Sequence, residues 1–507
     1  IQDNLTITGN GMQNTVIDGN NAIQIFYIQA GTVVMQSLSL INGNNAQNSG
    51  GGAILNCGIL DVNNVNFTNN HASSGGAIEN STCNNNTPQL TVTDSNFTAN
   101  LSDNLGGAIY SNVVTTTSIS NSNFSQNIAT NGKGGAIYND SSTLIVNNSN
   151  FTNNQAADRG GAIYTFSSNN NIVNSHFDQN IADSNGGAVY FSNNNINQGY
   201  VMTVDTSTFT NNQSTSGSGG AIYSSSATLN ILDSDFNLNT AAVDGGAIVA
   251  YSIVANISDS GFDQNSATGN GGAIQLDQSS TLTTNNSNFT NNQAILAGGA
   301  IYGAYGMLTV DTSTFTSNQA GVGGAILMNQ DTTISNSSFD QNSADSNGGA
   351  IHANGGANNT NILTLNSSTF TNNKAIGPSG TTWGKGGAIS TSFAYTNISN
   401  SNFDQNTAAI YGGAIYSSHG TLLTIDTTSF TNNQADSGGA IVAFIDVNIT
   451  KSTFDHNVTT DSGGAIFFYA KIALNINGST FSNNQTKNLG GAIYASADDG
   501  TVTIGDS

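Results

Sequence analysis

The chain has 507 residues, of which 30 are acidic and 7 are basic, so its formal net charge is −23. A surface of this charge repels nucleic acid and anionic lipid, and we expect neither as a partner. Hydrophobic residues make up 36% of the sequence, and no run approaches the about eighteen apolar residues of a spanning helix, so no membrane span is expected in this segment.

Residues 1–50 contain short apolar or alternating runs such as "LTITGNG", "IQIFYI" and "GTVVMQSLSLINGN", separated by Gly and Asn. This pattern is typical of strands and turns. We interpret residues 1–50 as irregular opening coils of the repeat array that occupies residues 51–507.

A Gly-Gly-Ala triplet punctuates the rest of the chain. Seventeen copies succeed one another, mostly 25 to 27 residues apart, and they end at Ala53, Ala77, Ala108, Ala136, Ala162, Ala188, Ala221, Ala247, Ala273, Ala300, Ala325, Ala350, Ala388, Ala414, Ala440, Ala465 and Ala492. A period of this length is typical of solenoids, in which each unit contacts only its neighbours. We therefore expect one elongated domain.

Sixteen repeats align on a phenylalanine, with Phe151, Phe177 and Phe209 as examples. An aliphatic residue stands five positions before it in fifteen repeats, and Ser stands two positions before it in fourteen. Spacings of two on either side of a step of three predict two short strands with a corner between them.

A third strand is predicted after the glycines. Ile follows the triplet in sixteen copies, including Ile163 and Ile222, whereas the next position varies widely. The Ile is therefore expected to face the core and its successor to face solvent. The sequence predicts an all-β, right-handed single-stranded parallel β-helix with three short strands per coil and about 19 coils, in which equivalent side chains stack in ladders.

Asn stands three positions after the Phe in all sixteen repeats, as in Asn154, Asn180 and Asn212. Asn tolerates a left-handed backbone, and stacked copies can form an amide ladder. We interpret this row as structural, with a sugar-binding strip as the alternative.

The strings "FTNN" and "FDQN", each followed by "GGAI", resemble the repeats of polymorphic outer-membrane-protein type surface proteins and of adhesin-like proteins of methanogenic archaea. The resemblance spans about residues 50–495. It implies a β-helix displayed extracellularly on a cell surface, with adhesion as its role. The partners would be glycans or surface proteins of another cell, or copies of the chain itself.

We predict a non-enzymatic protein that acts as an adhesin or as a structural stalk or filament subunit. The alternative is a polysaccharide-degrading, pectate-lyase-like enzyme, which would need unlike groups converging at one place. The recurring acids instead occupy one place in different coils, at Asp178, Asp263, Asp340, Asp404 and Asp455. The five histidines have no ligand-like spacing. We assign no catalytic residue, metal ligand or cofactor.

Two features are candidate partner contacts. The position after the Ile is Tyr in eight copies, including Tyr110, Tyr138, Tyr164 and Tyr190, which could form an aromatic stripe or simply suit an exposed strand. The second is an insertion: the distance from Phe to the triplet alanine is 18 residues in one repeat against 10 to 12 in the others.

The inserted residues, "IGPSGTTWGK", include the only tryptophan, Trp383, and the basic Lys385. Insertions at solenoid turns project where partners can reach them. We therefore predict a contact for a glycan or a protein partner. The alternative is a neutral insertion whose Trp folds back on the coils.

Cys57 and Cys83 are the only cysteines and lie 26 residues apart, about one repeat. A disulfide between adjacent coils is one prediction for them in an extracellular chain. Their offsets from Ala53 and Ala77 differ by two, so two unrelated small residues are the alternative.

Overall fold

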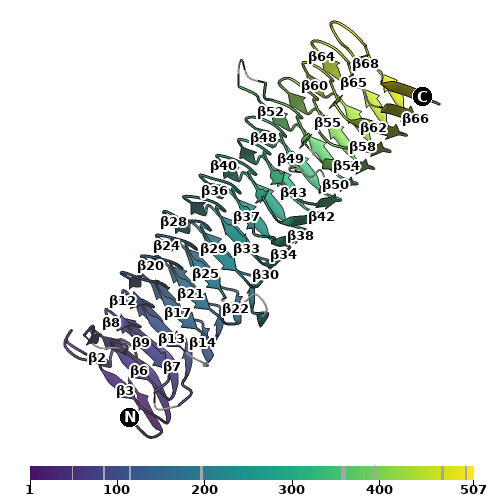
Figure 1. Ribbon diagram of the computed structural model, residues 1–507. Helices are drawn as coiled ribbons and strands as arrows, with labels where there is room; N and C mark the ends of the chain where they lie inside the picture. Colours follow the sequence, from purple (N-terminus) through teal and green to yellow (C-terminus); the bar gives the residue numbers. More distant parts are fainter. Residues whose placement is uncertain are drawn as a thin grey trace. The chain divides into compact units, whose positions relative to one another are not determined.

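The computed structural model describes residues 1–47, 50–83, 86–112, 116–193, 198–355, 361–378, 380, 382–392, 394–469, 473–496 and 500–506. Within these ranges the chain is all-β without a helix and forms about 18 turns of parallel β-solenoid. It divides into two compact units, Ile1–Ala255 and Asn256–Ser507, each built of successive coils (Figure 1). The predicted parallel β-helix is confirmed, with about 18 turns against the about 19 expected.

Each coil contributes to three parallel sheets, as one coil of the first unit illustrates. β17 (Ile137–Asp140) follows the glycines. β18 (Thr143–Asn147) and β19 (Asn150–Thr152), the two strands predicted around the corner, belong to the second sheet. β20 (Gln155–Ala156) belongs to the third sheet and follows the Asn. β20 was not predicted from the sequence, because a strand of two residues is too short to show a period.

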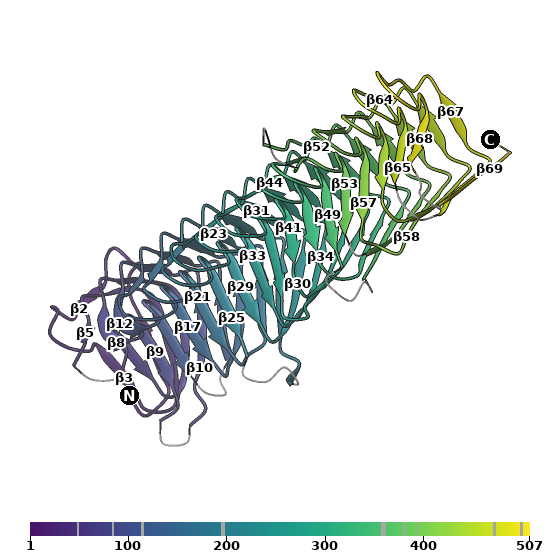
Figure 2. The ribbon, with the colours of Figure 1, turned by 45° about the horizontal axis from the view of Figure 1, so that its top comes forward.

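The strands of the glycine-following sheet pair in register from coil to coil, and Figure 2 shows β21, β25 and β29 side by side. In the unit Ile1–Ala255 this sheet contains β3 (Phe26–Ile28), β6 (Ile54–Asn56), β9 (Ile78–Ser81), β13 (Ile109–Asn112), β17, β21 (Ile163–Phe166), β25 (Val189–Ser192), β29 (Ile222–Ser225) and β33 (Ile248–Tyr251). In the unit Asn256–Ser507 it contains β37 (Ile274–Asp277), β41 (Ile301–Gly303), β45 (Ile326–Met328), β49 (Ile351–Asn354), β53 (Ile389–Ser392), β57 (Ile415–Ser418), β61 (Ile441–Ala443), β65 (Ile466–Tyr469) and β68 (Ile493–Ser496).

The first residues join the same architecture. β4 (Thr32–Ile41) pairs in parallel with β1 (Leu5–Thr8), β2 (Val16–Asp18) and β7 (Ile59–Thr68). β4 merges the two strands on either side of the corner into one, and its bend lies at the left-handed Ser37, with φ 57°. The second sheet therefore already exists before the first Gly-Gly-Ala triplet.

The core consists of stacked copies of the same side chain. Phe151 stacks on Phe177 and Phe177 on Phe209, with ring centroids 4.8 and 4.7 Å apart, and all three are fully buried. Ile163 and Ile222 both pair with Val189 of the strand between them in the same sheet, and they are also fully buried. Burying each such side chain stabilises the fold by about 1.5–3 kcal/mol.

The corners are made by residues in the left-handed region. In one coil these are Asn148, Asn153 and Gly160, with φ of 47°, 56° and 66°. Sequence analysis assigned the left-handed tolerance to the Asn three residues after the Phe, but the structure places it one residue earlier, at Asn153. The Ser two positions before the Phe links neighbouring coils. The Ser149 hydroxyl accepts a hydrogen bond from the backbone N–H of Ser122 in the adjacent coil at 3.1 Å.

The second glycine of the triplet that ends at Ala162 lies against the next coil. A Cβ added to Gly161 would lie 2.0 Å from the carbonyl oxygen of Gly187 and 2.6 Å from the backbone of Ile181. These neighbours are backbone atoms fixed by inter-coil hydrogen bonds, so they cannot move aside.

We therefore expect Gly161→Ala to destabilise the protein by about 1–3 kcal/mol or more through overpacking. The matched control is Gly491→Ala, because Gly491 holds the same place in its triplet and an added Cβ there meets nothing within 4 Å. Urea unfolding followed by circular dichroism measures both changes. Equal midpoints for the two variants would contradict this account of the triplet.

Candidate functional site

The Asn row is buried inside the turns in fifteen of its sixteen copies. The side-chain amide of Asn154 donates to the Oδ1 of Asn180 and to the carbonyl of Phe124, both at 3.0 Å. Its own Oδ1 accepts the amide and the backbone N–H of Asn127 at 2.9 and 3.1 Å. Asn180 repeats the pattern with Asn212 at 3.0 Å. Because these groups bond one another and are fully buried, a ligand cannot reach them.

The tyrosines after the Ile form a stack in the unit Ile1–Ala255. Ring centroids are 5.3 Å apart for Tyr110 and Tyr138, 4.8 Å for Tyr138 and Tyr164, 5.1 Å for Tyr164 and Tyr190, and 5.2 Å for Tyr190 and Tyr223. A sugar stacks on an open ring face, but both faces of the three central rings are covered by neighbouring rings. These residues can offer a partner only ring edges and hydroxyl groups.

Burial favours the neutral form of Tyr164, the central ring of the tyrosine stack. Tyr164 and Tyr190 are only 4% and 7% exposed, although their position was predicted to face solvent. Burial, followed by the charge of Tyr190, raises the pKa of Tyr164 to about 12. Two of the few basic residues, Lys133 and Arg159, lie 4.9 and 5.1 Å from the ring centres of Tyr164 and Tyr190.

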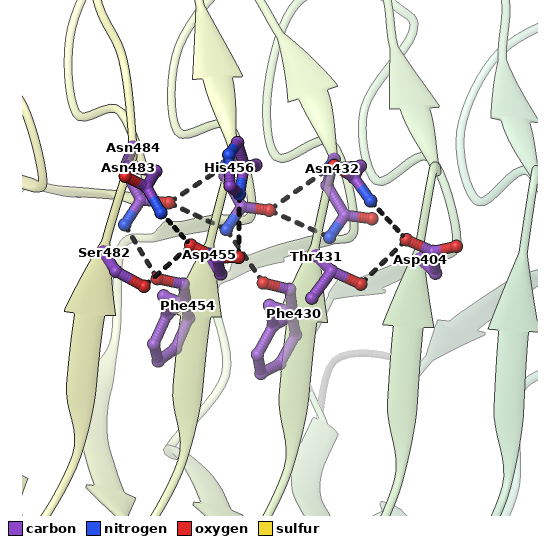
Figure 3. A network of polar contacts seen from close by, with 12 residues as sticks. Asp404, Phe430, Thr431, Asn432, Phe454, Asp455, His456, Ser482, Asn483 and Asn484 are labelled. Carbon is purple, nitrogen blue, oxygen red and sulfur yellow. Dashed lines mark hydrogen bonds and ion pairs between the residues drawn. The ribbon is translucent and has the colours of Figure 1, made fainter.

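The recurring aspartates accept hydrogen bonds from side chains of the next coil (Figure 3). The Oδ1 of Asp404 accepts the hydroxyl of Thr431 at 2.7 Å and the amide of Asn432 at 2.9 Å. The Oδ1 of Asp455 accepts Ser482 and Asn483 at the same two distances.

These bonds change the acidity of Asp455. Its Oδ2 also lies 2.7 Å from the Nδ1 of His456. Together the hydrogen bonds from Ser482, His456 and Asn483 lower the pKa of Asp455 to about 2. A carboxyl group of this pKa is a poor general acid or base near neutral pH.

The insertion after β52 (Lys374–Ala375) is held at both ends by backbone hydrogen bonds. Gly377 N–H donates to the carbonyl of Asp345 at 3.0 Å, and Gly384 accepts Ile410 N–H at 2.9 Å. A Cβ on Gly377 would lie 3.0 Å from the Cα of Gly384, so the two glycines form a narrow neck. Ser379 and Thr381 of the predicted insertion lie outside the described residues.

The structure separates the two candidate residues of this loop. Lys385 extends over two rings, with its Nζ 5.7 Å from the centre of Tyr411 and 5.0 Å from that of Tyr416. Trp383 is 52% exposed and lines a groove of about 450 Å³ together with Pro378. Lys385 does not line this groove, so the pair does not form one contact point.

The other walls of the groove were not predicted from the sequence. Ile295 and Leu296, 62% and 56% exposed, come from a turn two coils before the turn of Asp345, and Val322 comes from the coil between them. The signal in the sequence is "AILAGGA", where other repeats carry polar residues such as "ADSNGGA" before the triplet.

Cys57 and Cys83 form a disulfide with a Cα–Cα distance of 5.3 Å. Cys57 directly follows β6 and Cys83 lies two residues beyond β9, so the bond joins successive coils. Among the described residues, no group of three or more His, Cys, Asp or Glu side chains could hold a metal ion. Nor does this part of the chain contain a helix long and apolar enough to cross a membrane.

A family model described as the Chlamydia polymorphic membrane protein repeat matches eleven segments of the sequence, in both units. The chain carries polymorphic-membrane-protein-type repeats. The matched residues are 64–81, 121–140, 148–165, 174–192, 206–225, 262–277, 286–304, 336–354, 400–418, 427–443 and 478–496. These segments contain the corner, the Asn row and the Gly-Gly-Ala triplet described above.

Solved structures that match the chain include the PL6 family alginate lyase AlyGC and a mutant of it. They share 10% and 9% sequence identity with this chain, cover 99% of it and 97% of their own chains, and superpose with TM-scores of 0.31 and 0.29. Similarity at this level carries no argument about activity. No curated protein sequence matches the chain.

The Asn row gives a first prediction. Asn180→Ala removes the side-chain oxygen that accepts the backbone N–H and the side-chain amide of Asn154. It also removes the amide that donates to Asn212 and to the carbonyl of Phe151. Leaving buried groups unsatisfied costs about 1–3 kcal/mol each, so urea unfolding should show a clearly lowered midpoint. The control Asn150→Ala removes an exposed amide ladder contact and should change stability by about 0.5 kcal/mol at most. A similar loss in both variants would count against a buried role for the Asn row.

The lowered pKa of Asp455, to about 2, gives a prediction about pH. The unfolded-state pKa of Asp is about 3.9, so the stabilising contribution is complete above that pH and is lost as pH falls toward 2. NMR titration of the Asp455 side chain should give a midpoint near the pKa of about 2, and Ser482→Ala should raise that midpoint. A midpoint near 4 in the folded wild-type protein would show that the bonds in Figure 3 do not hold the carboxylate.

Proposed function

We propose that the chain is a non-enzymatic adhesion protein displayed at a cell surface. The observation that carries this proposal is the family match: the chain bears repeats named for a membrane protein family, in both of its units. Those repeats suggest surface association. Contact through many weak sites suits a repeat array, because linked contacts raise the effective concentration of each other.

The chemistry of the repeats supports binding in preference to catalysis. The amides of the Asn row are buried and hydrogen-bond one another. The carboxylates of Asp404 and Asp455, which hold the same position in their repeats, accept hydrogen bonds from neighbouring coils. Polysaccharide cleavage needs a base or acid whose pKa lies near the working pH. The low pKa of Asp455 is unsuited to that task.

Beads coated with the purified chain test the proposal. We expect saturable binding to at least one member of a panel of animal, bacterial and archaeal cells, with competition by the soluble chain. Albumin-coated beads are the control. The same chain, incubated with alginate and pectate in the presence of Ca²⁺, should release no unsaturated uronate absorbing in the ultraviolet.

Absence of competable binding across the panel would contradict the adhesion role. Release of unsaturated products would instead favour the alternative, a polysaccharide lyase.

A further inference from the structure

Exposed apolar side chains gather at one place in the unit Asn256–Ser507. Ile295, Leu296 and Trp383 are each more than half exposed, and they line the same groove as Val322 and Pro378. Their turns belong to successive coils on one side of the β-helix. Contiguous apolar surface of this kind marks interaction sites, because a soluble chain gains nothing from exposing it to water.

The groove is built on an anchored framework. In the turn of Leu296, the Leu296 N–H donates a hydrogen bond to the carbonyl of Gly269. The N–H of Val322 in turn donates to the Leu296 carbonyl at 3.0 Å. The glycine neck of the insertion fixes the stem of the loop that carries Trp383. The groove walls are therefore largely preformed, and little conformational entropy is lost when a partner binds.

A charge lies at the edge of this apolar surface. Asp345 lines the groove and is exposed, and no hydrogen bond or ion pair within the described residues engages its side chain. The whole chain carries a net charge of −23. A cationic group is therefore the complementary partner for this edge.

We propose that the groove binds a segment of a partner protein in which a large apolar side chain lies next to Lys or Arg. The apolar side chain enters between Trp383 and the pair Ile295 and Leu296, and the cation pairs with Asp345. The volume of about 450 Å³ is within the range of about 300–1,000 Å³ of small binding pockets. This proposal rests on the proposed adhesion role and names the chemical class of one partner.

The other occupants fit less well. A glycan needs several hydrogen-bonding groups, yet among the described lining residues only Asp345, Ser346 and the indole N–H of Trp383 supply polar side-chain groups. A second copy of the chain brings another 23 negative charges, which oppose its approach. A neutral or acidic apolar segment would leave Asp345 without a counter-charge.

Trp383 is the only tryptophan, so intrinsic tryptophan fluorescence of the full chain reports from the groove alone. The probe is a synthetic Trp-free peptide in which Phe lies between Leu and Arg. We expect a saturable shift of the emission to shorter wavelength, with weaker binding at higher salt. Matched peptides with Glu in place of Arg, or Ser in place of Leu and Phe, should bind about tenfold more weakly or not at all.

Variants locate the binding. The double variant Ile295→Ser, Leu296→Ser should weaken binding of the Arg peptide about tenfold or more, and Asp345→Asn should remove most of its salt dependence. Val243→Ser is the matched control, because Val243 is 43% exposed and holds the equivalent turn position in the other unit, bonded to Gly217. This control should bind the peptide as the wild-type chain does.

Three results would overturn the proposal: equal binding of all three peptides, an emission shift with maltohexaose but none with the Arg peptide, or a shift caused by concentrating the chain alone. The bead assay separates this failure from failure of the adhesion role. If the chain binds cells but the Arg peptide leaves the emission unchanged, only the groove assignment fails. Loss of cell binding in the wild-type chain would remove the adhesion role itself.

Discussion

The structure depends on one constraint, the in-register stacking of successive coils. Each strand residue lies against its counterpart in the next coil, and the Phe rings of each unit repeat at 4.6 to 4.9 Å. A position can therefore repeat one residue type only if that type tolerates its own copy. Phe and Ile do so by dispersion contact, and Asn does so because its amide both donates and accepts.

Aspartate is less compatible with its own copy, because two carboxylates one coil apart repel. The sequence resolves the conflict by alternation: "FDQN" coils are followed by "FTNN" coils over much of the chain. The structure shows the consequence at Asp404, whose neighbours one coil on are the donors Thr431 and Asn432. Asp311 obeys the same rule at another position, accepting Ser335 and Asn336 at 2.6 and 2.8 Å. The alternation of "FDQN" and "FTNN" coils therefore has an electrostatic reason.

The longer strands and the inward ladders could be predicted because stacking forces a repeated code, and a repeated code is visible in one sequence. The left-handed Asn153 was misplaced by one residue because Asn also fills the next position, and composition does not separate the buried amide from the corner. The closed faces of the tyrosine stack could not be deduced either. The sequence position of Tyr164 determines only the side of the sheet on which its ring lies. The neighbouring rings determine whether the face or the edge of that ring is open to solvent.

The groove is the part of the candidate site that sequence analysis could not assemble, because its walls come from turns of different coils, one of them lengthened. The lengthening does not disturb the ladder, since Ala375 still pairs with Ala344 before the insertion and with Ala408 after it. A solenoid turn can thus gain surface at little cost to the core, as the closure entropy of a surface loop grows slowly with its length. Residues inside the register must match their neighbours, whereas residues in the turns need not. Specific recognition in such a chain is therefore expected at turns like that of Trp383, where the stacking constraint does not apply.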